Sequence, residues 1–587
     1  MRDSASGEPI SYANVFLANT ALGAATNQDG YFVITNVPTG SYEINVSMMG
    51  YGLFKENITQ LDGNPVRIEI FLTEKVIETE EILVTAERQK FQKTVESSQI
   101  SLDLREIKAA PAFIEPDVFR TLQMLPGVQT SSDYSSALYV RGSTPDQNLI
   151  MQDGIAIYNE ENECYEITGQ KIWISNAGFA EVFIVFGKID DDENITGFVL
   201  EKSKSNGITL GEEESKLGLH ASSTRQVFYD KTVVPKNQML GIRGNGFKIA
   251  LNALNVGRIK LGAATGTAAI KVLNESIKYA IERKQFGKSI SDFGAIQEKL
   301  ATMATSIYTT FSGLYRAGYN IEQNTKRLES LGIEECEAKK DGVLEYSIEC
   351  SIIKVHGSEV IRDVSDEAIQ IFGGMGFSAE SIVEPAYRDA RISRIYEGTN
   401  EINRMLIVGT LLKRSMKKEI NLLEKAMVVI NSNKFESVSY DENNHFASAY
   451  NLISNLKNCL LYILGKSAMH FGNNIKTEQE VMMNIADMII SVYVMESTLK
   501  RCEKVYKNSN NKVLIDISKS SIYYNLSSFK YSSIESIISF MDDNECKNAE
   551  KLIETCTNFK HFNIKNINRR IADYFIEKKS YNIFNNF

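Results

Sequence analysis

Proline is distributed very unevenly along this chain of 587 residues. Seven of the nine prolines lie before residue 150, and none occurs in the 202 residues after Pro385. Proline lacks a backbone donor and breaks the interior of a helix, so a long stretch without it can form long helices. The first part of the chain therefore predicts strands and turns, and the last third predicts helices, as do leucines repeating every fourth residue from Leu452 to Leu464.

The charge balance changes along the chain too. Up to residue 158 there are 11 lysines and arginines against 20 aspartates and glutamates, whereas the other 429 residues carry 53 against 54. All five histidines and the single tryptophan follow residue 158. The two parts look like different proteins joined near Tyr158, so we expect a multidomain chain.

Several classes of protein are excluded or disfavoured by composition. A net charge of −10 argues against a nucleic-acid-binding surface. The seven cysteines are scattered without CxxC spacing, so we expect reduced thiols and neither a disulfide framework nor a metal site. No apolar run reaches the roughly 18 residues of a membrane-spanning helix. The start of the chain lacks the apolar segment of a signal peptide. We therefore expect a cytoplasmic protein.

Residues 7–72 alternate apolar and polar side chains between Asp-Gly and Pro-x-Gly turns, which predicts a small antiparallel β-sandwich. The stretch GEPISYANVFLANTALGAATNQDGYFVITNVPTGSYEINVSMMGY resembles the carboxypeptidase regulatory-like domain. We expect that domain over residues 1–75. Because the family usually opens one strand earlier, Met1 falls inside the expected domain.

Residues 76–158 carry a second resemblance. The segments EEILVTAERQ, LQMLPGVQT and LYVRGSTPDQNLIMQDGIAIYN are similar to the plug domain of TonB-dependent outer-membrane receptors. In that family more plug strands and a barrel follow, whereas here the resemblance stops, so we expect a partial plug with an unpaired sheet edge at Tyr158. An appendage without function is the main interpretation, and a receptor-derived binding fragment is the alternative.

After residue 159 the pattern changes again. Alternation predicts strands from residue 165 to about 235, and helical spacing follows Pro235. The polar segment 323–346, with Gly332 and Gly342, predicts a surface loop or insertion between helices.

Four clusters in this part are unusual for a purely structural protein, although each has a structural alternative. Trp173, in KIWISN, is either a core residue or a cofactor contact. The arginines of NVGR and RKQFG either complement a helix dipole or bind a phosphate. The glycines of QIFGGMG either cap a helix or let a phosphate approach closely.

The fourth cluster is RISRIYEGTNEINR. Thr399 is a natural N-cap for the helix that follows, and Gly398 permits a sharp entry into it. Glu397 then stands on the turn just before that helix, where a carboxylate can face a cleft. A solvated surface glutamate is the alternative.

In this order and spacing the clusters resemble the acyl-CoA dehydrogenase family, from about residue 165 to 412. Details such as DFGAIQEKLATM and IYEGTNEI, with a helical extension of about 180 residues, are similar to its very-long-chain subgroup. The motifs that carry the resemblance are GQKIWISNAGFA, KLGLHASSTRQVFYD, VPKNQMLG, GNGFKIALNALNVGRI, RKQFGKSISDFGAIQEKLATMA, AIQIFGGMGF and RISRIYEGTNEINR.

The resemblance implies a partial middle β-domain over residues 159–235, a C-terminal helical domain over 236–412 and a helical extension over 413–587. It implies FAD bound at the interface of a homodimer. The reaction would be α,β-dehydrogenation of a long-chain acyl-CoA to the trans-2-enoyl-CoA. Glu397 would be the base, and Gly257 occupies the position that holds the base in another subgroup. The resemblance implies no metal, and electron-transferring flavoprotein as a partner.

The resemblance also implies roles for individual residues. The expected cofactor contacts are Trp173, Ile174, Ser175, Arg283, Phe286, Gln370, Gly373, Gly374, Thr399, Asn400 and Glu401. The expected substrate contacts are Asn255, Arg258 and Gly398. Gly294 replaces the glutamine that many relatives use near FAD, as in the very-long-chain subgroup.

The chain departs from the family before residue 159. Neither the N-terminal helical domain nor the loop of type Tyr-x-Leu-Thr-Glu-Pro-x-x-Gly-Ser-Asp is present, so we expect the first strands of the β-domain to lack partners. We expect both the plug-like pattern and the dehydrogenase-like pattern to contain Tyr-Asn at the join. Unrelated genes recombine at such short shared stretches, and sequence assembly errs there. A non-functional chimera is therefore the alternative to a working enzyme. The basic run 413–418 leaves peripheral membrane contact as a minor expectation.

Overall fold

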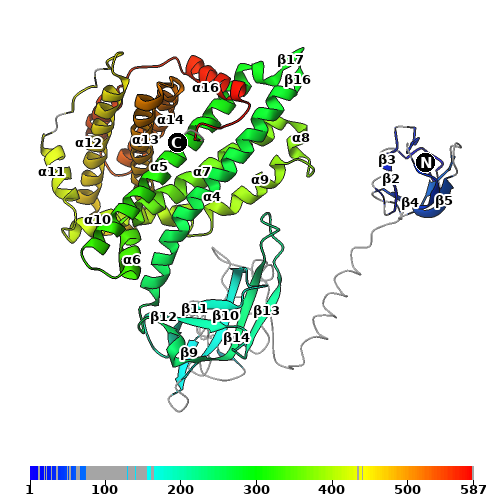
Figure 1. The fold of residues 1–587 in the computed structure, drawn as a ribbon, viewed down its shortest axis with the longest axis horizontal. Helices are drawn as coiled ribbons and strands as arrows, with labels where there is room; N and C mark the ends of the chain where they lie inside the picture. Colours follow the sequence, from blue (N-terminus) through cyan, green and yellow to red (C-terminus); the bar gives the residue numbers. More distant parts are fainter. Residues whose placement is uncertain are drawn as a thin grey trace. The chain divides into compact units, whose positions relative to one another are not determined.

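The computed structural model describes most of the chain. It describes the backbone alone of residues 128–129, 139–140 and 155–159, and residues 164–584 without 433–434 and 439. It also describes residues 1–73, with gaps at 5, 11–12, 19, 21–22, 28, 35–36, 49–50, 52–53 and 61–65. The chain divides into two compact units, Met1–Leu149 and Ile150–Phe587 (Figure 1).

The first unit contains a four-stranded antiparallel sheet in the order β3-β2-β4-β5, and β1 pairs with β6 in parallel. Its apolar core contains Val15, Leu17, Ile44 and Val46, all at most 2% exposed. The sheet-rich region predicted near the N-terminus is therefore confirmed. The strands are β1 (Arg2–Asp3), β2 (Asn14–Leu17), β3 (Gly23–Ala25), β4 (Gly40–Ser47), β5 (Phe54–Gln60) and β6 (Phe71–Leu72).

Most of the predicted plug, residues 76–158, lies outside the described residues. Two short antiparallel strands, β7 (Val128–Gln129) and β8 (Tyr139–Val140), are described there. The resemblance to a receptor plug stays a prediction.

The second unit begins with a seven-stranded sheet in the order β13-β14-β10-β9-β11-β12-β15. Alternate residues such as Phe183, Val185, Phe198 and Leu200 point into its core, which is why the sequence alternates. Strands predicted from residue 165 to about 235 are present. Its strands are β9 (Ile155–Asn159), β10 (Cys164–Ser175), β11 (Val182–Ile189), β12 (Ile195–Glu201), β13 (Ile208–Glu213), β14 (Thr224–Pro235) and β15 (Met239–Leu240).

Strand β9 corrects two expectations about the join. It pairs antiparallel with β10, with Tyr158 opposite Tyr165, and parallel with β11. The predicted unpaired edge at Tyr158 is wrong, and so is the expectation that the first strands lack partners, because residues 155–159 supply the strand between β10 and β11. The expected boundary after residue 158 falls inside this strand.

Three long helices form the centre of the helical part. Small residues let α4 and α7 approach closely: a Cβ on Gly262 would lie 2.2 Å from Ile353 Cγ2. The elements up to residue 416 are α4 (Gly246–Glu282), β16 (Lys284–Gln285), β17 (Lys288–Ser289), α5 (Gly294–Ser330), α6 (Glu335–Glu345), α7 (Ser347–Phe372), α8 (Gly374–Phe377), α9 (Val383–Ala390) and α10 (Asn400–Met416). The 3-10 helices are η2 (Lys236–Gln238), η3 (Ile290–Asp292) and η4 (Arg391–Arg394).

The loop predicted over 323–346 is wrong. Helix α5 continues to Ser330 and α6 follows from Glu335, with a turn at Gly332, whose φ is +84°. Gly342 does not mark a turn: a Cβ there would lie 2.2 Å from Thr325 Oγ1, so the glycine lets α6 pack against α5. Polar residues here belong to exposed helix faces.

The predicted helical extension is confirmed. Leu452, Leu456 and Leu464 lie in one buried cluster with α13 residues such as Met482, because a spacing of about four keeps them on one helix face. Its elements are α11 (Leu422–Ser432), α12 (His445–Phe471), η5 (Gly472–Lys476), α13 (Gln479–Ser509), α14 (Val513–Ile538), α15 (Asp543–Thr557) and α16 (Ile564–Lys578).

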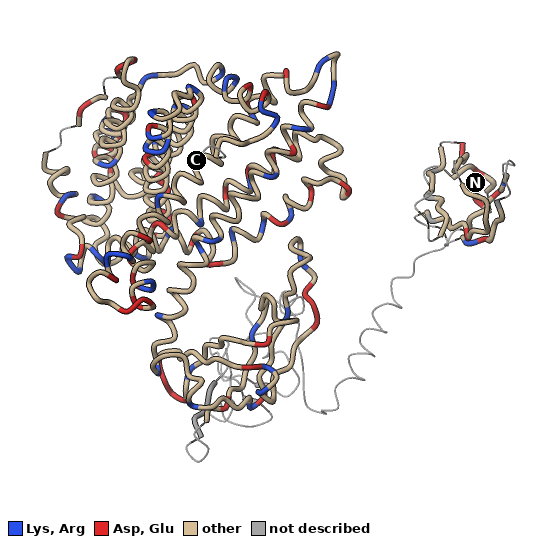
Figure 2. The backbone as a smooth tube through the Cα atoms, viewed as in Figure 1, with Lys and Arg blue, Asp and Glu red and all other residues tan. Residues whose placement is uncertain are grey.

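Acidic and basic residues are mixed along these helices (Figure 2). In the described part of the chain, no helix is long and apolar enough to cross a bilayer, and no cluster of side chains suits a metal ion.

Candidate active site

Glu397 lies on a left-handed turn between η4 and α10. Its φ is +58° and that of Gly398 is +79°. A non-glycine residue in this region costs roughly 1–3 kcal/mol and persists only where its surroundings hold it. Thr399 then caps α10, since its hydroxyl accepts from the Ile402 N–H at 3.3 Å. The predicted N-cap and sharp entry are confirmed.

Side chains from α4, α7 and α10 hold this turn. Asn403 Nδ2 donates to the carbonyls of Gly398 at 2.8 Å and Thr399 at 3.0 Å. Lys354 Nζ donates to the Gly398 carbonyl at 2.7 Å, and Arg258 Nε to the Glu397 carbonyl at 3.3 Å. Sequence reasoning missed Lys354 and Asn403. The only sequence pattern that could have pointed to them is a polar residue on an otherwise apolar helix face.

The carboxylate of Glu397 lies against Gly257 of α4. A Cβ on Gly257 would lie 2.4 Å from Glu397 Oε2 and 2.7 Å from Oε1, so only glycine leaves this space. Burial raises the pKa of Glu397, although Arg258 and Lys354 oppose the shift. This half-buried group is not the solvated surface glutamate of the alternative interpretation. A carboxylate with raised proton affinity suits a general base.

Asn255 and Arg258, predicted to contact substrate, are both 3% exposed. Arg258 Nη1 donates to Asn255 Oδ1 at 2.8 Å. Arg258 lies well inside α4, so for this residue the helix-end interpretation is wrong. Its role toward a substrate stays a prediction.

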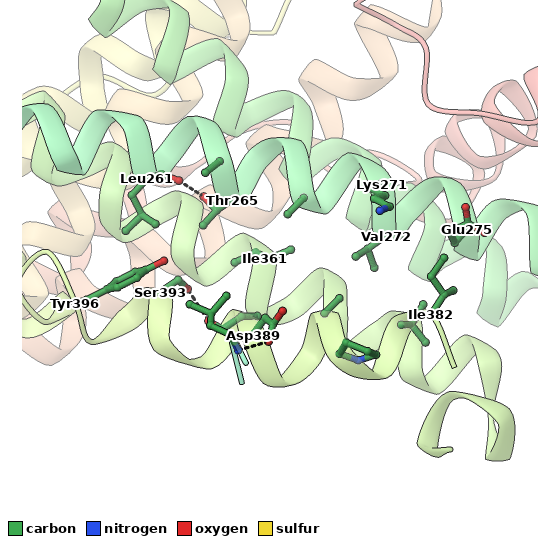
Figure 3. A pocket seen from close by; sticks show the side chains of 17 residues that line it. Leu261, Thr265, Lys271, Val272, Glu275, Ile361, Ile382, Asp389, Ser393 and Tyr396 are labelled. Atoms are coloured by element: carbon green, nitrogen blue, oxygen red, sulfur yellow. Dashed lines mark hydrogen bonds between the residues drawn. The ribbon is translucent and has the colours of Figure 1, made fainter. Parts of the chain in front are cut away.

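An apolar pocket of about 400 Å³ lies beside the turn, between α4 and α9, with Ile361 of α7 (Figure 3). Tyr396, the neighbour of Glu397, lies at one end, and Glu275 and Ile382 lie at the other. The Leu219 N–H donates to Asp389 Oδ1 at 2.6 Å, which joins the β-domain to the rim of the pocket. Most of its lining is aliphatic or aromatic, so an aliphatic chain fits it.

Trp173 is 68% exposed and has a φ of +57° near the end of β10. The core interpretation of this tryptophan is therefore wrong. Ser175 is also exposed, and Ile174 is half-buried. An indole and a hydroxyl accessible on one strand fit a planar, hydrogen-bonding ring such as a flavin.

Two more predicted cofactor contacts lie at corners of the helical part. Arg283 follows α4, and Phe286, at the tip of the β16–β17 hairpin, is 85% exposed with a φ of +51°. Gly373 ends α7 with a φ of +61°, so the capping interpretation is confirmed. Among the described residues, no atom beyond the adjoining backbone and chain neighbours lies within 4 Å of a Cβ added at Gly373 or Gly374. These open corners fit close approach by a large cofactor.

The remaining predicted contacts differ in accessibility. Gln370 and Glu401 are exposed. Asn400 is 3% exposed, and its amide bonds to Lys354 and Ser358 within the chain. A Cβ on Gly294 would lie 3.1 Å from Arg569 Nη2 of α16, so the extension places a guanidinium at this position. Sequence reasoning did not single out Arg569.

Much of the second unit matches known families. Residues 150–232 match "Acyl-CoA dehydrogenase, middle domain", and residues 244–412 and 455–549 match two families described as "Acyl-CoA dehydrogenase, C-terminal domain". Residues 1–84 match the "CarboxypepD_reg-like domain".

Individual proteins give the same picture. A probable acyl-CoA dehydrogenase of Bacillus subtilis is 40% identical over 60% of this chain and 58% of its own length. The mitochondrial very long-chain specific acyl-CoA dehydrogenase of Rattus norvegicus is 42% identical over 41% of this chain and 35% of its own. The chain thus spans less than two thirds of either relative.

A crystal structure of an acyl-CoA dehydrogenase complexed with FAD, from Bacillus anthracis, is 36% identical and has a TM-score of 0.70. The match covers 73% of each chain.

Proposed function

Because the chain belongs to the acyl-CoA dehydrogenase family, we propose that its second unit catalyses the α,β-dehydrogenation of an acyl-CoA thioester with Glu397 as the base. The observation that carries this proposal is the position of the Glu397 carboxylate, held against Gly257 on a strained turn beside an apolar pocket. Burial of the Glu397 carboxylate gives the chain a base whose pKa is raised.

The chemistry needs such a base. An α-proton beside a thioester is only mildly acidic, so a carboxylate must be held at the α-carbon while donors stabilise the charge on the carbonyl oxygen. The partly desolvated Glu397 takes the proton, and its fixed turn limits the motion of its carboxylate. The backbone N–H of Glu397 is the proposed donor on this turn.

FAD, when bound, supplies the acceptor for the hydride that leaves the β-carbon. The residues that would hold it are those whose exposure fits a large planar group. They are Trp173, Ile174 and Ser175 for the ring system, Arg283 and Phe286 for the phosphate and adenine side, and Gln370, Gly373 and Gly374 for the FAD of a partner subunit. Thr399 and Glu401 would contact the flavin beside the base, whereas Asn400 would act through the turn.

A long-chain acyl group is the proposed substrate. The pocket beside Tyr396 is lined by aliphatic residues such as Leu261, Val272 and Ile361. Similarity to the very long-chain specific relatives supports the same class. A homodimer and electron-transferring flavoprotein as electron acceptor complete the proposal.

The first experiment is to purify the whole chain, reconstitute it with FAD and add palmitoyl-CoA under anaerobic conditions. We expect flavin to copurify or bind, and its absorbance near 450 nm to bleach as substrate is oxidised, as expected for two-electron reduction of a bound flavin. A chain that binds flavin without bleaching would refute the proposed reaction. A folded chain that binds no flavin would favour the non-functional alternative.

A further inference from the structure

Lys354, in the first third of α7, carries a fully buried ammonium. It is 0% exposed, and its Nζ donates to the Gly398 carbonyl and to Asn400 Oδ1, each at 2.7 Å. The first acceptor belongs to the turn that follows Glu397, and the second belongs to the first residue of α10. In the described part of the chain, Lys354 forms no ion pair, and Glu359 of the same helix pairs with Arg404 instead. Its ammonium is therefore directed at the turn and not at a counter-ion.

Burying a charged side chain costs free energy of folding. A charge that is kept in the interior therefore suggests a role other than packing. Removing a charged group from water is unfavourable unless hydrogen bonds compensate, and a well-packed apolar side chain at the same place is often no less stable. Here burial lowers the pKa of Lys354 to about 8. Neighbouring buried positions of α7, such as Ile353 and Val355, are apolar, so packing alone does not require an ammonium at residue 354.

The two bonds of Lys354 hold the residues that follow the strained Glu397. Gly398, whose carbonyl it binds, has a φ of +79°, and Glu397 before it has a φ of +58°. Asn400 is fixed from the same side, because its Nδ2 donates to Ser358 Oγ at 3.1 Å, one turn further along α7. Thus α7 holds both the carbonyl after Glu397 and the first residue of α10.

We propose that Lys354 is a positioning residue for the proposed base: its buried ammonium binds the Gly398 carbonyl and the Asn400 side chain, and so keeps the Glu397 carboxylate over Gly257. This inference rests on the proposed function for its catalytic meaning, but the positioning itself concerns only this chain. The charged groups around Lys354 are Arg258 on α4, Glu359 on α7, Glu397 on the turn and Glu401 on α10.

The test compares Lys354→Met with Lys457→Met in the whole chain. Methionine keeps most of the stem volume and removes the ammonium. Lys457 of α12 is the control, because its Nζ also binds another helix, at Glu496 Oε1 (2.8 Å), but in the extension. The first readout is amide hydrogen exchange, by mass spectrometry, of peptides that cover residues 395–404 and, separately, α5.

We expect Lys354→Met to speed exchange at residues 395–404 by about tenfold or more while α5 stays unchanged, because a held turn that is released opens locally. Lys457→Met should leave the turn unchanged. Equal exchange at residues 395–404 in wild type and Lys354→Met would overturn the proposal. This readout needs no flavin and no substrate, so it separates the positioning role from the proposed reaction.

If wild type bleaches with palmitoyl-CoA, kinetics provide a second readout. We expect Lys354→Met to lower kcat by about 10- to 100-fold with KM changed less than about twofold, since a displaced base impairs chemistry more than binding. An unchanged kcat would overturn the proposal. If the methionine variant does not fold, Lys354→Gln replaces it: its amide NH₂ group keeps two donors but carries no charge and ends one bond short of the lysine Nζ. We then expect the same faster amide hydrogen exchange at residues 395–404. An unchanged exchange rate would contradict the proposal.

Discussion

The two sides of the candidate site differ in how much of their structure the chain itself supplies. The turn of Glu397 is enclosed: Arg258, Lys354 and Asn403, from three helices, donate to its backbone. The proposed flavin contacts are open, with Trp173 68% and Phe286 85% exposed. The turn of Glu397 is thus built by contacts within the second unit. The proposed flavin side instead presents large apolar side chains to a ligand.

This difference indicates which functions depend on the chain alone. A base positioned by buried hydrogen bonds is preorganised before any ligand arrives, whereas an exposed indole gains its contacts only when a ligand covers it. Substitutions on the enclosed side should change chemistry, and substitutions on the open side should change binding.

The largest effect is expected for Glu397→Gln. Glutamine has nearly the same shape but cannot accept the α-proton, so bleaching by palmitoyl-CoA should slow by about 10²- to 10⁴-fold, as for loss of a general base. Flavin binding should stay unchanged. The exposed Glu424→Gln on α11 is the matched control, and equal rates in both variants would remove Glu397 from the mechanism.

Gly257→Ala tests the enclosed side without touching the base. The new Cβ would lie 2.4 Å from Glu397 Oε2, so the carboxylate must move, and a displacement of about 1 Å can cost about 10² in rate. Gly318→Ala on α5 is the control, because a Cβ there has no neighbour within 4 Å among the described residues. The bleaching rate is measured for both. A Gly257→Ala variant as fast as wild type would contradict the described position of Glu397.

A pH series sharpens the comparison further. Burial raises the pKa of Glu397 above its ordinary value of 4.5, and only the ionised form acts as a base. We therefore expect kcat/KM to rise with pH through a pKa above 4.5. Because the folded state binds this proton more tightly, the contribution of Glu397 to the free energy of unfolding decreases as pH rises from the ordinary to the raised pKa. The acid limb of the bleaching rate should disappear in Glu397→Gln, and its persistence there would assign the limb to another group.

The smallest effect on the protein itself is expected on the open side. Since Trp173 is largely exposed, Trp173→Ala should change the free energy of unfolding by less than about 0.5 kcal/mol, the usual range for surface substitutions. FAD affinity should fall by about tenfold, because a stacked aromatic contact contributes on the order of 1 kcal/mol. Thermal unfolding and flavin fluorescence titration measure the two quantities. Unchanged affinity would exclude Trp173 from the flavin site.

Sequence patterns predicted the elements well where one periodicity dominates. The strands after residue 165 and the extension with Leu452 and Leu456 follow from alternation and from a four-residue spacing. The segment 323–346 was predicted as a surface loop or insertion because it is polar and contains Gly332 and Gly342, and only Gly332 lies at a turn. Gly342 instead fits a close contact with Thr325, and a sequence without its partner helix does not distinguish the two uses.

The sequence by itself determined the local structure around the proposed base. Thr399 caps α10, Gly398 allows the sharp turn, and Glu397 stands before them, because capping and left-handed backbone are local properties of residue type. The sequence motifs also determined the family, because their order and spacing can be recognised without knowing any tertiary contact.

Only the tertiary structure decided what surrounds Glu397. Gly257 and Lys354 are 140 and 43 residues away from it in the sequence, yet one makes room for its carboxylate and the other binds the turn after it. The same holds for β9, where backbone pairing places residues 155–159 between two strands of the sheet. Such contacts depend on how helices and strands pack, and no local pattern encodes which residues the packing brings together.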